Sequence, residues 1–295
     1  MFKSGFITIV GKANVGKSTL LNCIVNQKIS ITSPKPQTTR NKINGIITTN
    51  DYQLVITDTP GMHKVKNKLD AFMSDTIKSS FEGIDVVLYM LDGLKPFSEE
   101  DLTLIEEYSK NLPVIVVVSK IDKTKMDKLY PKLASLNNLK NVKDIIPISS
   151  FRKKNIDVLL NSILKYIPEG VKYYNDDEVT DVSLKFLSSE IVREKALLYL
   201  QQEVPHGLAV VIENFTEGEN LLKISATIFC EKPAHKIIII GKNGEMLKKI
   251  GKSSREEIER ICGSKVFLEL WVKVKENWRN SEVLLNNLGY NKKDI

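Results

Sequence analysis

The stretch GKANVGKS, residues 11–18, decides how the first half of the chain folds. It follows a short apolar run at residues 6–10 and precedes a helical pattern at residues 19–26. A glycine-rich turn of this spacing between a strand and a helix points backbone N–H groups at a phosphate, and the helix dipole favours the negative charge. The sequence therefore predicts a phosphate-binding loop in which Lys17 reaches the outer phosphates and the Ser18 hydroxyl ligates Mg²⁺.

Five short apolar runs recur through the first half of the chain. They cover residues 6–10, 53–57, 85–91, 114–118 and 144–148. Nearly continuous Val, Ile and Leu is typical of strands buried on both faces, so we expect an α/β fold with a mostly parallel sheet and helices on both faces. The polar stretch 29–44, with its prolines and threonines, is predicted to be a loop.

Polar motifs follow these strands, where ligands of parallel sheets bind. The motif Asp58-Thr59-Pro60-Gly61 comes after the second strand, so its carboxylate is a candidate for the Mg²⁺ shell and the Gly61 N–H for the γ-phosphate. Thr38 and Thr39 in the polar loop are alternative candidates to close over the metal ion.

The motif Ser119-Lys120-Ile121-Asp122 indicates which base is bound. A carboxylate at Asp122 accepts hydrogen bonds from both N1–H and the amino group of guanine, which adenine does not offer. We expect this carboxylate to be buried, and since leaving a buried carboxylate unpaired lowers affinity, this position would select the base. Ser149 and Ser150, after the last strand, are candidates to present backbone N–H groups to guanine O6.

Composition limits the classes of protein. The 295 residues suggest two domains, and the apolar runs are far shorter than the roughly 20 residues of a membrane-spanning helix. The phosphate-loop pattern begins too early for a secretory signal to precede it, and the three cysteines have no disulfide or zinc spacing. These features predict a protein of the reducing cytoplasm.

The second half changes in charge and in pattern. Residues 171–231 carry 5 basic and 11 acidic side chains, whereas residues 232–279 carry 12 basic and 6 acidic ones. A helical pattern at 182–200, a hairpin at 208–229, a Gly241-Lys242-Asn243-Gly244 turn, a long helix to about residue 261 and a strand at 266–274 follow one another. The basic region fits a nucleic-acid surface, although a solvated helix face remains an alternative.

The order and spacing of these motifs resemble the Era family of bacterial ribosome-assembly GTPases over nearly the whole chain. This resemblance implies a P-loop GTPase domain at 1–168, a linker at 169–180, a type II KH domain of α+β architecture at 181–279 and a tail at 280–295. It also implies that residues 237–240, which β-propensity would make a strand, are helical.

The resemblance further implies a GTPase of slow intrinsic turnover. It would bind the 3′ region of 16S ribosomal RNA and act in biogenesis of the small (30S) ribosomal subunit. It would be a cytoplasmic monomer with peripheral association to the inner membrane, and DNA would not be a partner.

The resemblance also assigns site residues. The implied catalytic residues are Lys17, Thr39 and Gly61, and the implied Mg²⁺ ligands are Ser18, Thr39 and Asp58. The implied GTP- and GDP-binding residues are Gly11, Asn14, Val15, Gly16, Lys17, Ser18, Thr19, Thr38, Thr39, Asp58, Gly61, Ser119, Lys120, Asp122, Ser149 and Ser150. The implied RNA-binding residues are Gly241, Lys242, Asn243, Gly244, Lys248, Lys249 and Lys252.

Three positions shape the expected chemistry. Ser119 replaces the asparagine that braces base and phosphate loop in the family, so nucleotide affinity is expected to be lower. Met62 stands where small signalling GTPases have the glutamine that orients the attacking water. Asn14 resembles an asparagine that ligates K⁺ in related GTPases, which implies stimulation of hydrolysis by K⁺.

Two other functions remain open on the sequence alone. One is a P-loop phosphotransferase with an accessory domain, although no evident lid or substrate carboxylate supports it. The other is an RNA-binding module with a degenerate, poorly hydrolysing nucleotide site, which Met62 and Ser119 favour.

Overall fold

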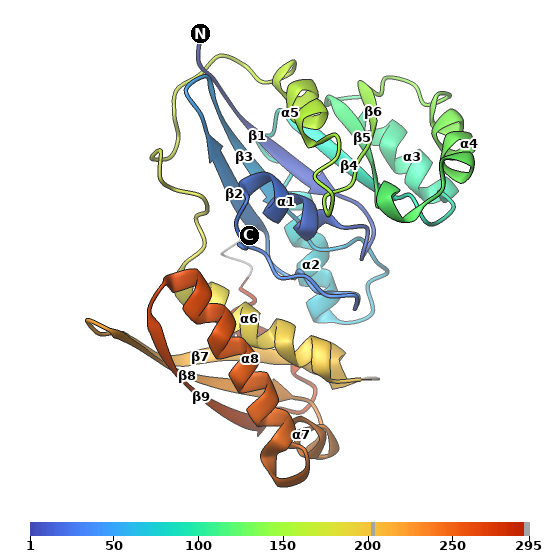
Figure 1. Cartoon of the computed structure of the whole chain (residues 1–295). Helices are drawn as coiled ribbons and strands as arrows, with labels where there is room; N and C mark the ends of the chain where they lie inside the picture. Colours follow the sequence, from blue (N-terminus) through green and yellow to red (C-terminus); the bar gives the residue numbers. More distant parts are fainter. Residues whose placement is uncertain (202–203, 292–295) are drawn as a thin grey trace. The chain divides into compact units, whose positions relative to one another are not determined.

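A six-stranded sheet organises the first half of the chain in the computed structural model, which describes residues 1–201 and 204–291 (Figure 1). Its strand order is β2-β3-β1-β4-β5-β6. The strands are β1 (Lys3–Val10), β2 (Ile43–Thr48), β3 (Tyr52–Asp58), β4 (Val86–Asp92), β5 (Val114–Ser119) and β6 (Asp144–Pro147). The pairings are parallel except for β2, which runs antiparallel to β3. The five predicted strands are confirmed.

Strand β2 was not predicted from the sequence. The polar loop was expected to extend to residue 44, but Ile43 and Asn44 already pair with Asp58 and Thr57. The strand lies at an edge of the sheet and carries polar residues and a glycine, so it lacks the continuous apolar character of the central strands. Its pairing with β3 through a short turn, rather than its own composition, makes it a strand.

Helices cover both faces of this sheet. They are α1 (Lys17–Val25), α2 (Lys68–Ser79), α3 (Glu99–Tyr108), α4 (Met126–Leu136) and α5 (Ile156–Leu164). In Figure 1, α1 and α5 lie on the nearer face and α3 lies beyond the sheet. Ile105 of α3 and Leu129 of α4 join buried residues of β4 and β5 in one core cluster. The predicted fold class, a mostly parallel sheet between helices, is confirmed.

The strand register brings the polar motifs together. Ile9 of β1 pairs with Asp58 at the end of β3, and Asp92 at the end of β4 pairs with Ser119 at the end of β5. The phosphate loop follows β1 directly. All these segments therefore leave the sheet at the same edge, formed by the carboxyl ends of its parallel strands.

The chain divides into two compact units. Unit 1 comprises residues 1–30, 39–63 and 74–181, and unit 2 comprises residues 31–38, 64–73 and 182–295. Two short pieces of the predicted GTPase domain thus belong to the second unit. The predicted domain boundaries stay a prediction.

The predicted linker, 169–180, packs within unit 1. The Ile46 N–H donates to Val179 O at 2.9 Å, and the Tyr173 N–H donates to Gln53 Oε1 at 2.7 Å. The rings of Phe6 and Tyr173 lie 4.8 Å apart. This segment therefore lies along strands β2 and β3, held by backbone and side-chain contacts.

Unit 2 is built on a three-stranded sheet in the order β7-β8-β9. Its elements are α6 (Leu184–Tyr199), β7 (Ala209–Glu217), β8 (Leu221–Cys230), α7 (Pro233–Ile240), α8 (Glu245–Cys262), β9 (Lys265–Val274) and α9 (Glu282–Asn287). Strands β7 and β8 form the predicted antiparallel hairpin, and β9 runs parallel to β8. The predicted helix at 237–240 is confirmed: Pro233 begins α7, where its missing N–H costs nothing.

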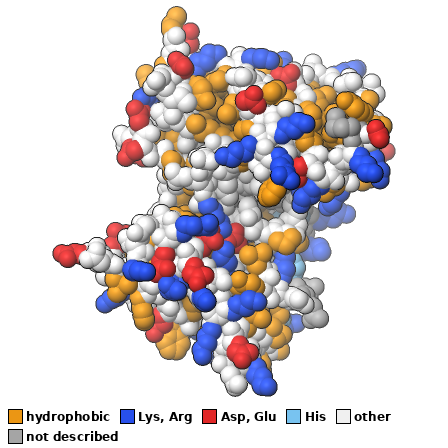
Figure 2. Space-filling model, in the orientation of Figure 1, with side chains coloured by type: hydrophobic (Ala, Val, Ile, Leu, Met, Phe, Trp, Pro, Cys, Tyr) orange, Lys and Arg blue, Asp and Glu red, His pale blue; other side chains and the backbone are white. Residues whose placement is uncertain are grey.

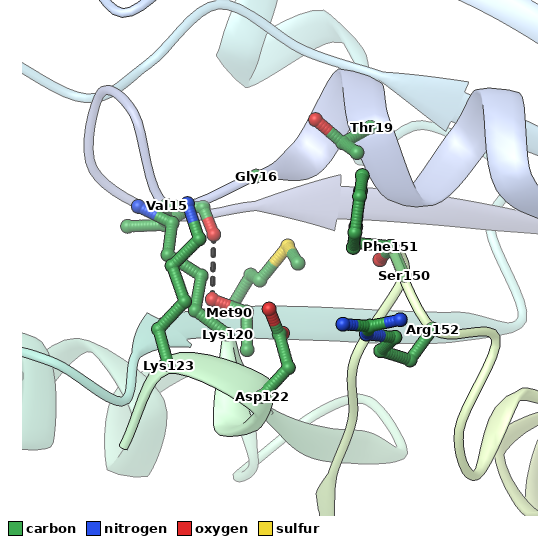
Figure 3. A pocket seen from close by; sticks show the side chains of 11 residues that line it. Val15, Gly16, Thr19, Met90, Lys120, Asp122, Lys123, Ser150, Phe151 and Arg152 are labelled. Atoms are coloured by element: carbon green, nitrogen blue, oxygen red, sulfur yellow. Dashed lines mark hydrogen bonds between the residues drawn. The ribbon is translucent and has the colours of Figure 1, made fainter.

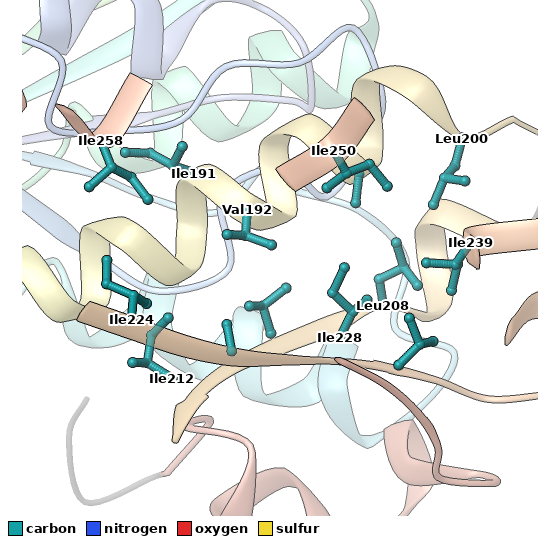
Figure 4. Close-up of a cluster of buried hydrophobic side chains, with 14 of the residues drawn as sticks. Ile191, Val192, Leu200, Leu208, Ile212, Ile224, Ile228, Ile239, Ile250 and Ile258 are labelled. Atoms are coloured by element: carbon teal, nitrogen blue, oxygen red, sulfur yellow. The ribbon is translucent and has the colours of Figure 1, made fainter. Parts of the chain in front are cut away.

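One face of this sheet carries the main core of unit 2 (Figure 4). Ile191 and Val192 of α6 and Ile250 of α8 pack over Ile224 and Ile228 of β8. This α+β layer matches the expected type II KH architecture.

A second apolar cluster in unit 2 contains part of the predicted tail. Trp278 is fully buried and its Nε1–H donates to Gly207 O at 3.0 Å. Leu285 of α9 and Tyr290 join it, together with Phe72 from the first half of α2. The segment 280–291 is therefore folded, while residues 292–295 of the predicted tail lie outside the described residues.

Candidate functional site

The phosphate-loop motif adopts a backbone shape that only certain residues allow. Gly11 and Gly16 have φ of 146° and 107°, and Asn14 has φ of 64°. A Cβ on Gly11 would lie 2.4 Å from Met90 O, so no side chain fits there. Helix α1 begins directly after Gly16. The loop therefore ends at a helix N-terminus, the geometry expected of a phosphate site.

Lys17 is the buried cation of this loop. Its Nζ donates to the carbonyls of Gly11 and Lys12, each at 3.1 Å. Burial lowers the pKa of Lys17 to about 8, and the nearby Asp58 carboxylate partly opposes this shift. A bound phosphate would be a stronger partner for this ammonium than the two neutral carbonyls, because a hydrogen bond between two charged groups is stronger than one to a neutral acceptor.

Oxygen atoms gather beside Lys17 around Asp58. Oδ2 of Asp58 accepts from the hydroxyls of Ser18 at 2.6 Å, Ser30 at 2.9 Å and Thr39 at 3.3 Å. Oδ1 of the same carboxylate is buried and has no hydrogen-bond partner among the described residues. Burial raises the pKa of Asp58, and Lys17 opposes that shift.

This donor set fits a magnesium ion. Mg²⁺ prefers hard oxygen ligands and keeps several waters, so one carboxylate and one or two hydroxyls suffice. The Oδ1 of Asp58 supplies an oxygen that is not engaged elsewhere among the described residues. Those residues contain no group of three or more His, Cys, Asp or Glu side chains that could hold a metal ion. The hydroxyls of Ser18 and Thr39, which both contact Asp58, are the further oxygen donors of this candidate set.

Thr38 and Thr39 point to different partners. The Thr39 hydroxyl lies 2.8 Å from the Ser18 hydroxyl, whereas the Thr38 hydroxyl donates to Lys35 O at 2.7 Å. Of the two alternatives left open by the sequence, the structure brings Thr39 to the oxygen cluster.

Gly61 lies directly against the phosphate loop. A Cβ at Gly61 would approach the Ala13 Cα to 2.6 Å, and the next residue, Met62, donates its N–H to Gly11 O at 3.1 Å. Gly61 therefore allows the close approach of two backbone segments, which places its own N–H beside the phosphate loop.

Ser119 keeps a contact with the phosphate loop. Its buried hydroxyl lies 2.6 Å from Val15 O and 3.0 Å from Leu91 O. Lys120 adds a second brace, because its Nζ donates to Asn14 O at 2.6 Å and pairs with Asp92 at 2.8 Å. The short hydroxyl thus still braces the loop, although its effect on nucleotide affinity stays a prediction.

A pocket of about 490 Å³ opens beside this brace (Figure 3). It is lined by Val15, Gly16, Thr19, Met90, Ser119, Lys120, Asp122, Lys123, Ser150, Phe151 and Arg152. The expectation that Asp122 is buried is wrong, because its side chain is exposed along this open pocket. Ser149 orients the carboxylate by donating its hydroxyl proton to Oδ1 at 2.6 Å.

The sequence interpretation missed some of the lining. Met90 comes from a central strand, so nothing in its pattern distinguishes it from a core residue. Phe151 and Arg152 directly follow Ser149 and Ser150, and this proximity to the predicted base contacts was an available signal.

The second glycine loop lies between α7 and α8. Gly241 and Gly244 have φ of 74° and 77°, and Asn243 between them has φ of 51°. A Cβ on Gly241 would lie 2.7 Å from the Met246 Cβ, whereas one on Gly244 would meet no described atom within 4 Å. The loop therefore stays open to an approaching backbone at Gly244.

The predicted basic residues of α8 are exposed, but they share the surface with acids. Lys252 lies 3.9 Å from Glu256, and Lys249 Nζ lies 4.4 Å from the centre of the Tyr199 ring. Figure 2 shows Lys and Arg side chains mixed with Asp and Glu over this helix. Lys242 in the loop and Lys248 in the first turns are exposed, so they offer positive charge close to Gly244.

Both halves of the chain match known protein families. Residues 6–120 match the family described as a 50S ribosome-binding GTPase, and residues 203–279 match the KH domain. GTPase Era from Clostridium kluyveri is 50% identical over 292 residues, which is 98% of this chain and all of that protein. The chain belongs to the Era GTPase family.

Other Era proteins agree. GTPase Era from Caldanaerobacter subterraneus subsp. tengcongensis is 46% identical over 98% of each chain. A crystal structure of Era in complex with MgGDPNP and nucleotides 1506–1542 of 16S ribosomal RNA is 40% identical, with a TM-score of 0.94 over 99% of this chain and all of that one. A variant of Aquifex aeolicus Era bound to GDP·AlF4⁻ gives the same identity and TM-score over 98% of this chain and all of that one.

Membership in the Era family makes this protein a GTPase with a KH domain. It favours GTP hydrolysis over the two functions that the sequence left open. Among the described residues, no helix combines the length and the apolar character needed to cross a membrane.

Proposed function

We propose that the chain is a Mg²⁺-dependent GTP-hydrolysing switch whose second unit binds the 3′ region of 16S ribosomal RNA during small-subunit biogenesis. The observation that carries the nucleotide part is the meeting of Lys17, Asp58 and Asp122 at one edge of the sheet. Lys17 balances phosphate charge, Asp58 holds the metal, and Asp122 reads the base. Phosphate release from GTP but not from ATP, and only with Mg²⁺ present, is the expected result.

The chain's own groups give each reactant a defined place. The P-loop N–H groups and Lys17 hold the β- and γ-phosphates, and the hydroxyls of Ser18 and Thr39 complete the metal shell with Asp58. Mg²⁺, when bound, offsets the negative charge that develops on the phosphate oxygens. Gly61 lies close to Ala13 of the phosphate loop, and its backbone N–H is the proposed donor to the γ-phosphate.

Met62 explains why slow turnover is expected. Its side chain packs against the core cluster of β4 and β5, and a thioether has no proton with which to orient water. Hydrolysis then depends on backbone groups and the metal ion. Replacing Met62 by Gln should raise turnover at saturating GTP; an unchanged rate in phosphate-release assays would show that water is positioned elsewhere.

A potassium ion at Asn14 is part of this proposal. Asn14 has the left-handed backbone of the loop, and its carbonyl is held by Lys120. A monovalent cation there would offset developing charge beside the phosphates. We expect faster turnover in KCl than in NaCl at matched ionic strength, and Asn14→Ala should remove the difference. Equal rates in the two salts would reject this element.

The RNA part rests on the open glycine loop and on the related structure. Gly244 leaves room for a phosphate backbone, exposed Lys242 and Lys248 add charge, and the neighbouring Ile237 and Ile238 are 71% and 47% exposed on α7. KH domains clamp about four nucleotides at such a loop. Crosslinking to total cellular RNA at nucleotide resolution, with GTP and then GDP, should enrich the 3′ end of 16S RNA; crosslinks elsewhere would contradict the target.

Contacts within unit 2 suggest how nucleotide state reaches the RNA-binding part. Arg193 of α6 donates to Thr38 O, and Glu194 accepts the Thr32 N–H at 2.8 Å. Thr38 immediately precedes the proposed metal ligand Thr39. A γ-phosphate that orders Thr39 therefore also orders the adjoining segment, which is hydrogen-bonded to α6. Loss of the γ-phosphate releases that segment.

The remaining assignments concern the setting. We propose a cytoplasmic monomer with peripheral association to the inner membrane and no DNA partner. Sedimentation equilibrium should give the mass of one chain. Flotation with anionic vesicles should recover a fraction of the protein that high salt removes, and failure to float would reject the membrane association.

A further inference from the structure

Ser30 carries a fully buried hydroxyl beside the proposed metal site. Its Oγ donates to Asp58 Oδ2 at 2.9 Å. Most side-chain hydrogen bonds in proteins go to the backbone or to water. The buried Ser109 follows this rule, because its hydroxyl donates to two backbone carbonyls at 2.9 and 3.1 Å. Ser30 is bonded instead to the carboxylate that is proposed to hold Mg²⁺.

The bond from Ser30 differs in kind from the two other hydroxyl contacts of Asp58. Oδ2 also accepts from Ser18 and Thr39, but these hydroxyls are themselves proposed ligands of the ion. Ser30 is not a proposed ligand, so its bond to Asp58 does not compete with the ion. It holds Oδ2, while the buried Oδ1, which has no hydrogen-bond partner among the described residues, is left for the ion or one of its waters.

Asn22 of α1 holds Ser30 from the other side. Its Nδ2 donates to Ser30 O at 2.6 Å, and its Oδ1 accepts the N–H groups of Ile29 and Ser30, each at 3.0 Å. One side chain therefore binds both backbone polar groups of Ser30. Since α1 begins at the phosphate loop and β3 ends at Asp58, these bonds join the two elements that carry the site.

We propose that Ser30 is a positioning residue of the Mg²⁺ site: it sets the orientation of the Asp58 carboxylate, and Asn22 sets the place of Ser30. The inference rests on the proposed GTPase function and adds residues to it that do not touch the ion. Groups that hydrogen-bond the ligands of a metal orient them, and losing such a group lowers metal affinity about 10- to 100-fold. Asn22, Ser30 and Asp58 all belong to unit 1, which contains the whole arrangement.

The first test is calorimetric titration of the full chain with GDPNP, a GTP analogue that resists hydrolysis, in EDTA and then at rising Mg²⁺ concentrations. Ser30→Ala should leave the affinity in EDTA unchanged and raise the Mg²⁺ concentration for half of the metal-dependent gain about 10-fold. Ser30→Thr keeps the hydroxyl and should keep the normal Mg²⁺ dependence. Ser109→Ala removes a buried hydroxyl that bonds to backbone carbonyls, so it is the matched control with unchanged Mg²⁺ dependence.

A double-mutant cycle tests the role of Asn22. Asn22→Ala should raise the required Mg²⁺ concentration in the same direction as Ser30→Ala. The double variant should need no more Mg²⁺ than Ser30→Ala alone, because residues that act through one another are not additive. Additive losses would show that Asn22 does not act through Ser30 and would overturn this part of the proposal.

Mn²⁺ gives a direct readout of the metal without turnover, because it prefers the same oxygen ligands and its paramagnetic resonance signal falls when the free ion is bound. In the GDPNP complex, Ser30→Ala should bind Mn²⁺ about 10-fold more weakly than the unchanged protein.

The outcomes separate this inference from the proposed function. If the unchanged protein binds no GDPNP, or binds it equally well with and without Mg²⁺, the proposed function fails and the inference fails with it. If the unchanged protein requires Mg²⁺ and Ser30→Ala requires no more of it, only the inference fails. An equal loss of GDPNP affinity in EDTA and in Mg²⁺ would also overturn the inference, because it would show a general disturbance of the site.

Discussion

The two glycine loops of this chain share one feature and differ in their surroundings. Each has glycines at positive φ immediately before a helix, α1 in one case and α8 in the other. The loop at residues 11–18 is closely surrounded: a Cβ on Gly11 would lie 2.4 Å from Met90 O, and the buried Lys17 ammonium donates to the carbonyls of Gly11 and Lys12. The loop at residues 241–244 is open at Gly244 and carries an exposed lysine.

This difference indicates what each loop can hold. An enclosed loop with a buried cation and a buried carboxylate discriminates, because any ligand that leaves those charges unpaired is penalised. An open loop with exposed charge attracts a phosphate backbone without reading much of it. Glycines at positive φ before a helix are thus compatible with both the proposed nucleotide site and the proposed RNA clamp, and the surroundings distinguish the two.

The largest expected effect comes from removing the buried cation. Lys17→Ala should weaken GDP about 1,000-fold, since truncating one partner of a buried charge pair costs about 4 kcal/mol. RNA affinity in the absence of nucleotide should be unchanged. Lys12→Ala is the control, because that ammonium turns away to Ser98 and Asp101. Calorimetry that finds equal losses for the two variants would contradict the role given to Lys17.

Base selection should respond next. Asp122→Asn removes two hydrogen bonds from a carboxylate to guanine, so GDP affinity should fall about 100-fold. The new amide can donate to the carbonyl that xanthine has in place of the guanine amino group, so XDP should bind better than to the unchanged protein. Competition titrations with GDP and XDP measure both changes. Unaltered preference for GDP would mean that another group reads the base.

RNA binding at the open loop should be sensitive to an added negative charge. Gly244→Asp places a carboxylate where a phosphate would lie, so affinity for a 16S RNA 3′-end oligonucleotide should fall about 10-fold. Gly263→Asp is the matched control: this residue has φ of 69°, lies at the other end of α8 and likewise has open space around it. Filter binding that finds the same loss for both variants would locate the RNA elsewhere.

The smallest effect concerns protons. The folded, nucleotide-free protein holds Lys17 with a pKa of about 8, below its usual 10.5, because of burial. A bound polyphosphate favours the charged form, so above pH 8 binding must take up a proton and GDP affinity should fall, at most about 10-fold per pH unit. Calorimetry at pH 8.5 in two buffers of different ionisation enthalpy should reveal this uptake, and at pH 6.5 it should vanish. If the heat of GDP binding at pH 8.5 is the same in both buffers, the lowered pKa of Lys17 is contradicted.

Much of the fold and of the site followed from local signals. The central strands β3, β1, β4 and β5 were predictable because residues buried on both faces must be almost continuously apolar, and the edge strand β6 was predictable from its short apolar run. The P-loop, Asp58 and Asp122 were predictable because each follows such a strand, and parallel strands end at one edge. Strand β2 and the folding of residues 281–290 were not, since their stability comes from partners distant in sequence rather than from their own pattern.

The sequence by itself predicted a glycine-rich turn between a strand and a helix, a carboxylate just after the strand β5 and a G-x-x-G turn between two helices, and the structure has all three. These features depend on backbone sterics and residue chemistry within a few positions. Only the tertiary structure shows that the Thr39 hydroxyl lies beside Ser18 and Asp58 whereas the Thr38 hydroxyl bonds to Lys35 O. It alone also shows that Ser119 reaches the phosphate loop and that Phe151 lines the same pocket as Asp122. Those outcomes depend on which side chains converge from separate strands and loops, and a linear pattern does not encode their distances.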